Sequence, residues 1–342
     1  MPSSIDAATL PSRLFLTGGS GYVGRNLIRH FVAQGVPVVA MARSANAAET
    51  VSALGAIPFA GDLLDTGLNE AMAGCQWLVH AAADIDHGRG TPEQRRTNLD
   101  GTRNVLAAAR AAGISRALYI STESVLLDGR PLIEAREAHP FPRHPAGAYS
   151  RTKGEAERLA LSLAAPGFAV MAIRPRLVWG RDDSTALPQL TAAARSGQMA
   201  FIDGGRYLTS TTHIANLCTG IQLALTKGGS GENYFITDGA PVEFRSFITS
   251  LLETQGIAAP DKTVPRWLLR TMANVGDALA NISGGRIKAP ITLQQFATSA
   301  VEVTLDISKA RHELGYAPVI TAAEGLTELR AMHAQRELRE AQ

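Results

Sequence analysis

The chain has 342 residues, of which 45% are hydrophobic and 19% charged, so it is long enough for a large core and too apolar to be disordered. Its formal net charge of +2 comes from scattered lysines and arginines, which argues against a groove for nucleic acid. The two cysteines, Cys75 and Cys218, favour a reducing compartment, and the first residues lack the pattern of a signal peptide. We therefore expect a cytoplasmic protein.

From Leu14 onward, short apolar or β-branched runs alternate with alanine-rich helical runs, which predicts a parallel sheet with helices on both faces. The helices expected at 24–35 and 98–113 end in glycine, as helix C-termini often do. The predicted strands cover residues 13–18, 37–43, 56–61, 77–82, 116–122 and 168–175.

Beyond Pro175 the alternation gives way to loops rich in Gly, Asp, Ser and Thr, with helices expected near 187–196 and 213–226. A late run, 233–238, is typical of a strand and is expected to return to the main sheet. We therefore predict one domain over residues 1–176, with returning segments near 207–239, and a smaller, interleaved domain made mainly of residues 177–342. The tail, 322–340, is predicted to be a charged amphipathic helix.

The stretch "FLTGGSGYVG" places Gly18, Gly21 and Gly24 directly after a strand and at the opening of a helix. Glycines there permit a tight turn and a close backbone approach, so a pyrophosphate can bind free N–H groups at the helix N-terminus. Tyr22 and Val23, between the last two glycines, are expected to contact the same cofactor. The fold class predicted for residues 1–176 is therefore a Rossmann-type, doubly wound α/β domain that binds a dinucleotide.

The second strand lacks the acidic residue that would bind a ribose 2′-hydroxyl, and Arg43 and Ser44 follow it instead. A guanidinium can neutralise a 2′-phosphate, so NADP is preferred over NAD, which stays possible. Asp62, after the third strand and next to Leu63, is a candidate acceptor for the adenine amino group, or else the N-cap of the next helix. The small residues at 81–83 leave room for a cofactor across the sheet edge.

Tyr149 and Lys153 stand four residues apart in a predicted helix and therefore share one helical face. A phenol protonates an alkoxide efficiently only if its pKa, normally about 10, moves toward neutrality, and a nearby ammonium would lower it. Thr122 ends a strand, where it can hydrogen-bond a developing oxyanion. These three residues are the predicted catalytic groups, with Lys153 also reaching the nicotinamide ribose.

These motifs resemble the extended short-chain dehydrogenase/reductase family over nearly the whole chain: "TGGSGYVG", "HAAA" before Asp84, "NLDGTRNV" and the pair Tyr149 and Lys153 all match. The resemblance implies that Asn98 completes the catalytic set and that Thr122 fills the catalytic Ser/Thr position. It implies that Pro175 and Val178, in "RPRLVWG", face the nicotinamide. It also implies a homodimer that pairs helices 98–113 and 148–165.

The segment 231–248 is similar to the 3β-hydroxysteroid dehydrogenase and sterol 4-carboxylate 3-dehydrogenase branch of that family. This likeness implies a secondary alcohol or ketone on a bulky apolar small molecule, and relatives of the branch also reduce 2-alkyl-3-oxo acids. Candidate substrate contacts are Asp84, Glu123, Ser124 and Arg176. The helix expected at 264–282 carries charged residues that a bilayer span excludes, so we expect no membrane span. We also expect no metal ion.

Two other functions stay open. The first is a nucleotide-sugar epimerase or dehydratase, but dehydratases of the family carry an Asp–Glu pair where this chain has Glu123 and Ser124. Epimerases usually carry the acidic ribose ligand that is missing here. The second is a non-catalytic NADP-sensing protein, which predicts a broken pair in place of Tyr149 and Lys153.

Overall fold

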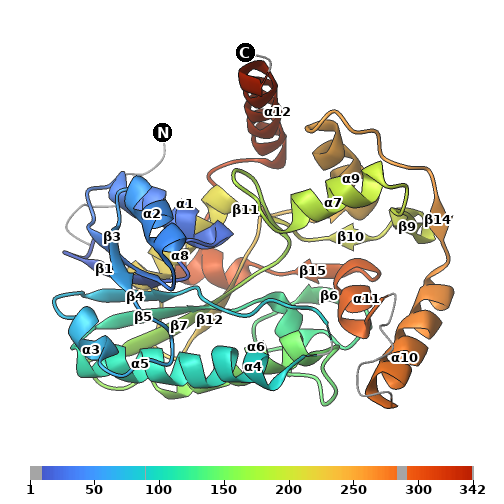
Figure 1. Ribbon diagram of the computed structural model, residues 1–342. Helices are drawn as coiled ribbons and strands as arrows, with labels where there is room; N and C mark the ends of the chain where they lie inside the picture. The colour runs from blue at the N-terminus through green and yellow to red at the C-terminus, as the bar shows by residue number, and fades with distance from the viewer. Residues whose placement is uncertain (1–9, 89, 283–290, 341–342) are drawn as a thin grey trace.

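A seven-stranded parallel sheet forms the centre of the molecule (Figure 1). The computed structural model describes residues 10–88, 90–282 and 291–340. All six strands predicted before Pro175 are present, and the predicted late strand does return to this sheet. From edge to edge the strands are β12 (Asn233–Ile236), β7 (Ala169–Pro175), β5 (Arg116–Ile120), β4 (Trp77–His80), β1 (Leu14–Thr17), β2 (Val38–Ala42) and β3 (Ile57–Ala60).

Strand β1 shows why these apolar runs become central strands. Successive side chains of a strand point to opposite faces, so Leu14 and Leu16 enter one hydrophobic cluster and Phe15 enters the other. All of its side chains are buried, which is typical of a parallel strand covered on both faces.

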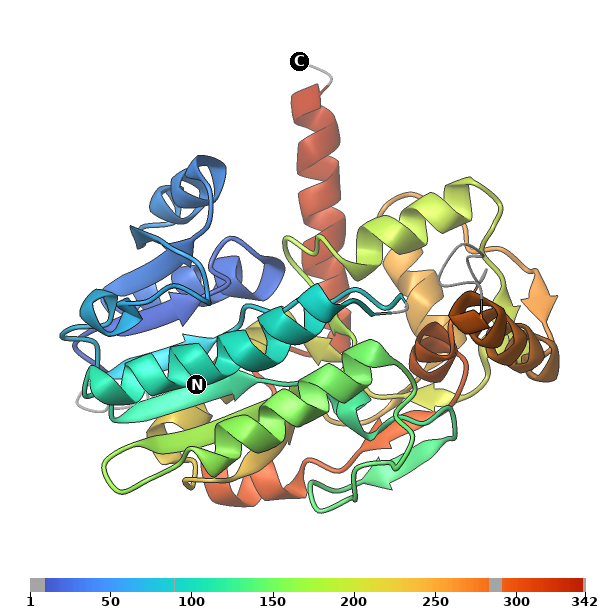
Figure 2. The same cartoon turned by 60° about the horizontal axis from the view of Figure 1, so that its bottom comes forward.

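Helices cover both faces of the sheet. On one side lie α1 (Tyr22–Val32), α2 (Ala45–Ala53) and α8 (Ile214–Lys227), as Figure 1 shows. On the other side lie α3 (Leu68–Ala71), α4 (Pro92–Arg95), α5 (Gly101–Ala111) and α6 (Ala148–Ser162), with α5 and α6 next to one another (Figures 1 and 2). The predicted α/β fold is thereby confirmed.

A second group of elements lies beside the main sheet. Its four-stranded sheet has the order β13 (Val242–Glu243), β10 (Leu208–Thr209), β15 (Val303–Leu305) and β6 (Leu132–Ala135). Two short parallel pairs accompany it: β8 (Val178–Trp179) with β11 (Thr212–His213), and β9 (Phe201–Ile202) with β14 (Thr263–Val264). The helices of this group are α7 (Ala186–Arg195), α9 (Phe244–Glu253), α10 (Arg266–Ile282) and α11 (Leu293–Ser299).

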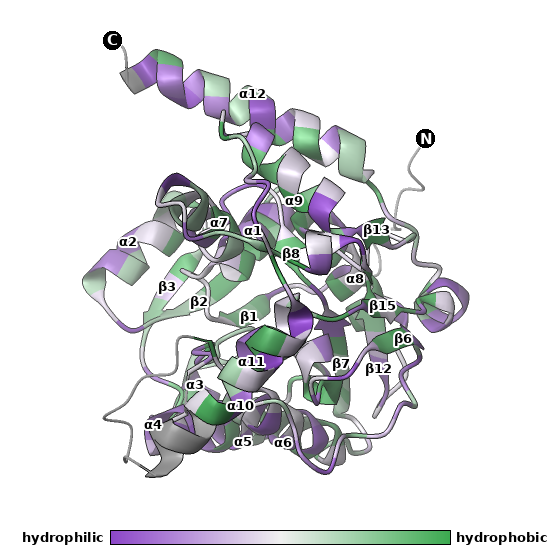
Figure 3. Cartoon of the chain, turned by 90° about the vertical axis from the view of Figure 1, so that its right-hand side faces the viewer, coloured by the Kyte–Doolittle hydropathy of each residue, from purple (hydrophilic) through white to green (hydrophobic). Residues whose placement is uncertain are grey.

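Helix α12 (Ala322–Glu340) has the predicted span and projects from the body of the molecule (Figure 1). Polar and apolar residues alternate along it (Figure 3). Leu329 is buried in the cluster around Trp179, whereas Leu338, near the outer end, is 66% exposed. Across the described ranges, no helix is long and apolar enough to cross a membrane. Residues 1–9, on which the signal-peptide prediction partly rests, lie outside those ranges.

Candidate active site

A cavity of about 1910 Å³ opens at the carboxyl ends of the central strands. Parallel sheets bind ligands at this edge, where neighbouring strands send their helices to opposite faces. Pockets for drug-sized ligands typically measure roughly 300–1,000 Å³, so this volume suits a dinucleotide together with a substrate. The cavity is lined by most of the predicted site residues: Gly18, Gly21, Tyr22, Val23, Gly24, Arg43, Ser44, Leu63, Ala81, Ala82, Ala83, Thr122, Glu123, Ser124, Tyr149, Lys153, Pro175 and Val178.

The glycine loop has the geometry of a phosphate cradle. Gly18 has φ +73°, and a Cβ added there would lie 2.7 Å from the backbone nitrogen of Ala82. A Cβ at Gly24 would lie 2.1 Å from the Gly18 carbonyl oxygen. Helix α1 starts directly after Gly21, and no side chain caps it, so its first N–H groups are available to an anion. The loop therefore fits the pyrophosphate of a dinucleotide.

Arg43 and Ser44 stand at the end of β2, on the cavity wall. The Arg43 side chain is 74% exposed, and its Nη1 lies 4.0 Å from Oδ2 of Asp62. Ser44 caps α2 by accepting a hydrogen bond from the Ala47 N–H. Asp62 lies outside the cavity lining among the described residues, and its Oδ1 accepts from the Leu64 N–H within its own loop.

Asn98 is not among the described residues that line the cavity; it connects two segments behind it. Its Oδ1 accepts from the Asp84 N–H at 2.8 Å, and its Nδ2 donates to the Asp84 carbonyl at 3.0 Å and to Thr152 Oγ1 at 3.1 Å. Thr152 in turn donates to the Tyr149 carbonyl. Asn98 thereby joins the loop after β4 to α6, and Asp84 takes part through its backbone, while its carboxylate accepts from the Asp86 N–H.

Tyr149 and Lys153 both line the cavity from the first turns of α6. The Lys153 ammonium donates to the Ile120 carbonyl at 2.6 Å and lies 4.1 Å from the centroid of the Tyr119 ring. Burial lowers the pKa of Lys153 to about 7. The His87 ring packs on the Tyr149 ring, with 4.7 Å between centroids.

The pKa of Tyr149 differs from the sequence expectation. Burial raises it above its ordinary value, the Glu123 carboxylate raises it further, and a hydrogen bond with Thr122 lowers it. The predicted lowering by Lys153 is therefore wrong for this structure, because the ammonium is directed at the Ile120 carbonyl and a carboxylate faces the phenol instead. Tyr149 consequently stays protonated at neutral pH.

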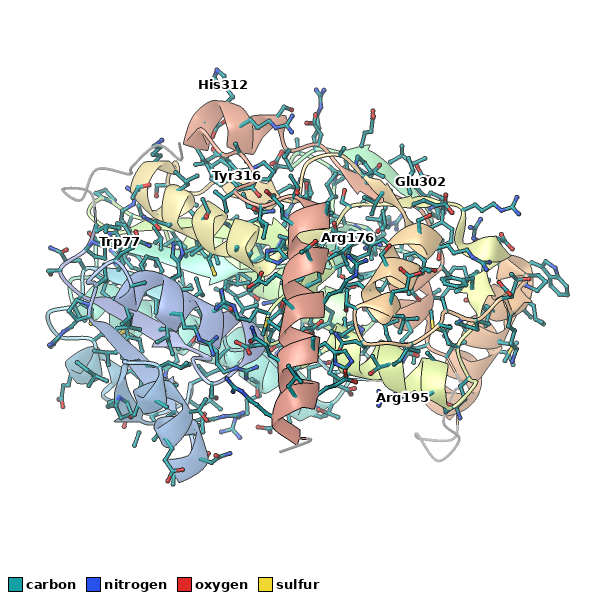
Figure 4. All side chains as sticks on the ribbon, turned by 90° about the horizontal axis from the view of Figure 1, so that it is seen from above. Trp77, Arg176, Arg195, Glu302, His312 and Tyr316 are labelled. Atoms are coloured by element: carbon teal, nitrogen blue, oxygen red, sulfur yellow. The ribbon has the colours of Figure 1, made fainter. Side chains whose placement is uncertain are left out.

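Thr122, Glu123 and Arg176 form a buried chain beside Tyr149. Thr122 caps a short 3₁₀ turn, 123–126, and its hydroxyl donates to Glu123 Oε2 at 2.8 Å. Glu123 Oε1 accepts from Arg176 Nη1 at 2.6 Å. The structure places Arg176 behind Glu123 and not among the described residues that line the cavity, so its role as a substrate contact stays a prediction. Figure 4 shows Arg176 near the middle of the molecule.

Helices far along the chain complete the cavity in a way that the sequence did not reveal. Gln294 and Thr298 reach it from α11, and Phe244 and Ile248 reach it from α9. Thr292 and Gln295 form a capping box, which could have predicted the start of α11. No local signal tells that this helix packs against the N-terminus of α6.

Residues 15–266 match the model of the 3-beta hydroxysteroid dehydrogenase/isomerase family. The chain belongs to this family. It is similar to the 4-hydroxy-2-methyl-3-oxo-4-farnesyl-3,4-dihydroquinoline-1-oxide ketoreductase of Stigmatella aurantiaca, with 49% identity over 93% of this chain and 96% of that protein. The decarboxylating sterol-4-alpha-carboxylate 3-dehydrogenase of Dictyostelium discoideum is 30% identical over 92% of this chain and 99% of its own length.

A dTDP-glucose 4,6-dehydratase from Streptomyces venezuelae, solved with NAD bound, has the same fold, with a TM-score of 0.74 over 95% of this chain and 98% of that one. At 22% identity this likeness concerns the fold alone. The predictions of an extended short-chain dehydrogenase/reductase and of an enzyme acting on CH–OH groups are confirmed by the family and its relatives.

Proposed function

We propose that the protein is an NADP(H)-dependent oxidoreductase that interconverts a secondary alcohol and a ketone on a bulky, largely apolar substrate. The observation that carries this proposal is the meeting of Thr122, Tyr149 and Lys153 in one cavity with the uncapped glycine loop. When bound, the nicotinamide would supply or accept the hydride. The glycine loop after β1 would hold the pyrophosphate of the dinucleotide.

The protein's own part is to place and move a proton. In ketone reduction, Tyr149 would donate its phenolic proton to the alkoxide oxygen, which is basic enough to accept it although burial and Glu123 raise the Tyr149 pKa. Thr122 stands beside it, where it can orient the carbonyl. Asn98 is a positioning residue that fixes the first turn of α6.

The preference for NADP rests on the end of β2. An acidic residue would be expected there for binding to a ribose 2′-hydroxyl, and this chain has Arg43 on the cavity wall. The exposed Arg43 guanidinium lies 4.0 Å from the Asp62 carboxylate, a long distance for an ion pair. Arg43 is therefore still able to reach a phosphate. NAD stays possible, since the glycine loop would bind either dinucleotide.

The substrate part of the cavity favours an apolar molecule. Leu177, Leu190, Phe244, Ile248 and Ile85 contribute to its wall. The Stigmatella relative is named for a substrate with a farnesyl group and a 3-oxo group, which supports a bulky ketone.

Replacing Tyr149 by Phe tests the proposal, because it removes only the hydroxyl. Turnover of a ketone, followed by NADPH absorbance, should fall by about 10²–10⁴-fold while NADPH binding survives. Tyr316→Phe is the matched control, since the Tyr316 hydroxyl is also buried but donates to the Thr237 carbonyl outside the cavity lining (Figure 4). Unchanged turnover in Tyr149→Phe, or interconversion of nucleotide sugars without net NADPH oxidation, would reject the proposal.

The proposal extends to the organisation of the protein. Residues 1–176, with the returning segments near 207–239, would bind the cofactor, and residues 177–342 would mainly bind the substrate. A homodimer would form through α5 and α6, which run side by side (Figure 2). Light scattering at micromolar concentration should give twice the monomer mass. The buried free thiols of Cys75 and Cys218 are compatible with the cytoplasm.

A further inference from the structure

The hydroxyl of Thr122 has a single proton, and that proton is already in use. It is donated to Glu123 Oε2 at 2.8 Å, while the Thr122 oxygen accepts the Ser124 N–H at 3.1 Å and Tyr149 also lies within hydrogen-bonding reach of this hydroxyl. A substrate carbonyl can receive this proton only if Thr122 releases Glu123. A ligand that satisfies the Glu123 oxygen in place of Thr122 would therefore complete the site.

The Glu123 carboxylate is held in place by an ion pair. Arg176 donates to Oε1 at 2.6 Å, and the rest of its guanidinium is held by Thr209 Oγ1 at 2.9 Å and the Thr298 carbonyl at 3.0 Å. Ser124 Oγ adds a weaker donor to Oε1 at 3.4 Å. Arg176 is therefore committed to the protein, and Glu123 keeps its Oε2 side toward Thr122.

The Oε2 oxygen has lone pairs left for a further donor. A carboxylate offers about four lone-pair sites, and the hydrogen bonds among the described residues give Oε2 only the Thr122 hydroxyl. Glu123 lines the cavity and raises the pKa of Tyr149, so its charge lies next to the reacting position. A substrate O–H beside the carbonyl would meet a carboxylate acceptor there.

We propose that Glu123 determines specificity for ketones that carry a hydroxyl on the carbon next to the carbonyl. This inference rests on the proposed ketone reduction. The two oxygens of such an α-hydroxyketone are separated by about the length of a hydrogen bond, as are Thr122 Oγ1 and Glu123 Oε2. The substrate hydroxyl would donate to Oε2, and the freed Thr122 hydroxyl would donate to the carbonyl.

The same geometry disfavours substrates with a carboxylate in that position. A 3-oxo acid, or a sterol with a carboxylate next to its reacting carbon, would bring a second negative charge toward Glu123. Arg176 already pairs with Glu123, and its hydrogen bonds go to Glu123, Thr209 and Thr298, so it weakens the repulsion without binding the acid directly. Like charges in a partly desolvated site repel, so such acids should be poor substrates.

Benzoin and deoxybenzoin test the proposal, because they share one diphenyl skeleton and differ only in the α-hydroxyl. A hydrogen bond to a charged acceptor predicts that kcat/KM with NADPH is about 10- to 100-fold higher for benzoin. The double variant Glu123→Leu with Arg176→Met removes both buried charges without leaving one unpaired, and the benzoin preference should fall to the intrinsic reactivity difference of the two ketones.

The matched control is the double variant Glu157→Leu with Arg174→Met, which removes another buried pair and should keep the benzoin preference. Calorimetry of both ketones with the wild-type protein and NADP⁺ provides a readout independent of turnover. If neither ketone is reduced but benzoin still binds at least tenfold more tightly, the proposed function fails and the role of Glu123 stands. Equal or undetectable binding of the two ketones, or an equal preference in both double variants, overturns the role of Glu123.

Discussion

Arg174 and Arg176 flank Pro175, and each forms a buried ion pair with a glutamate, yet the two pairs lie in different surroundings. Arg174 lies in β7 and holds Glu157 of α6, with Nε 2.9 Å from Oε2 and 3.1 Å from Oε1. Arg176 lies just beyond the strand and holds Glu123. Of the two glutamates, only Glu123 is among the described residues that line the cavity.

The neighbours of each carboxylate explain the contrast. Glu157 is enclosed by Arg174 and by the Ser121 hydroxyl, and the Phe141 and Phe235 rings pack near the guanidinium. Its hydrogen bonds therefore connect β5, α6 and β7. The Glu123 carboxylate shares its hydrogen bonds with Thr122 and influences Tyr149. The Arg174 pair connects sheet and helix, with Glu157 also raising the pKa of Lys153, whereas Glu123 lies in the cavity and raises the pKa of Tyr149.

The largest effect should follow Glu157→Leu, because it leaves the Arg174 guanidinium buried without its counter-ion. Removing one partner of a buried pair costs about 3–5 kcal/mol of unfolding free energy, which urea unfolding measures. Adding Arg174→Met should recover much of the loss. If Glu157→Leu alone is as stable as the wild type, water or other groups compensate the Arg174 charge. The stabilising role assigned to the Arg174–Glu157 pair would then be wrong.

A smaller effect, on pH dependence, should follow Glu123→Gln. In alcohol oxidation Tyr149 must give up its proton before it can act as the base, so the rate rises with pH through the Tyr149 pKa. The Glu123 charge raises that pKa, and the neutral amide should lower it, moving the rising limb of the pH–rate profile for oxidation to lower pH.

Ser124→Ala is the control for this shift, because Ser124 lines the same cavity and carries no charge. Its pH–rate profile should coincide with that of the wild type. A Glu123→Gln profile that moves to higher pH, or does not move, would contradict the assigned electrostatic effect.

The difference between the two pairs also marks the limit of the sequence analysis. The strands of the main sheet, the glycine loop and the Tyr149–Lys153 pair were predictable because each depends on local periodicity or spacing. The partner of Arg176 depends on how two distant loops pack, and the sequence placed this arginine in the substrate pocket. Strand β6 was missed for a similar reason, because it pairs with β15 from the far end of the chain.

The raised pKa of Tyr149 shows the same limit in electrostatic terms. Helical spacing correctly placed Lys153 near Tyr149, and from this a lowered pKa was expected. Desolvation and the adjacent Glu123 outweigh that effect, and neither can be quantified without the fold. Burial likewise lowers the pKa of Lys153 itself to about 7.

The smallest expected effect concerns a third pair, Arg43 with Asp62, which is exposed and 4.0 Å apart. Exposed pairs contribute little to stability, so Arg43→Ala should leave the urea midpoint unchanged. Under the proposed NADP preference it should weaken NADPH binding about tenfold, because one charge-assisted contact to the 2′-phosphate is lost, and leave NADH binding unchanged. Arg110→Ala, at the exposed end of α5, controls for the loss of a surface charge. Fluorescence titration with both cofactors measures the affinities, and equal losses for NADPH and NADH would place Arg43 outside 2′-phosphate recognition.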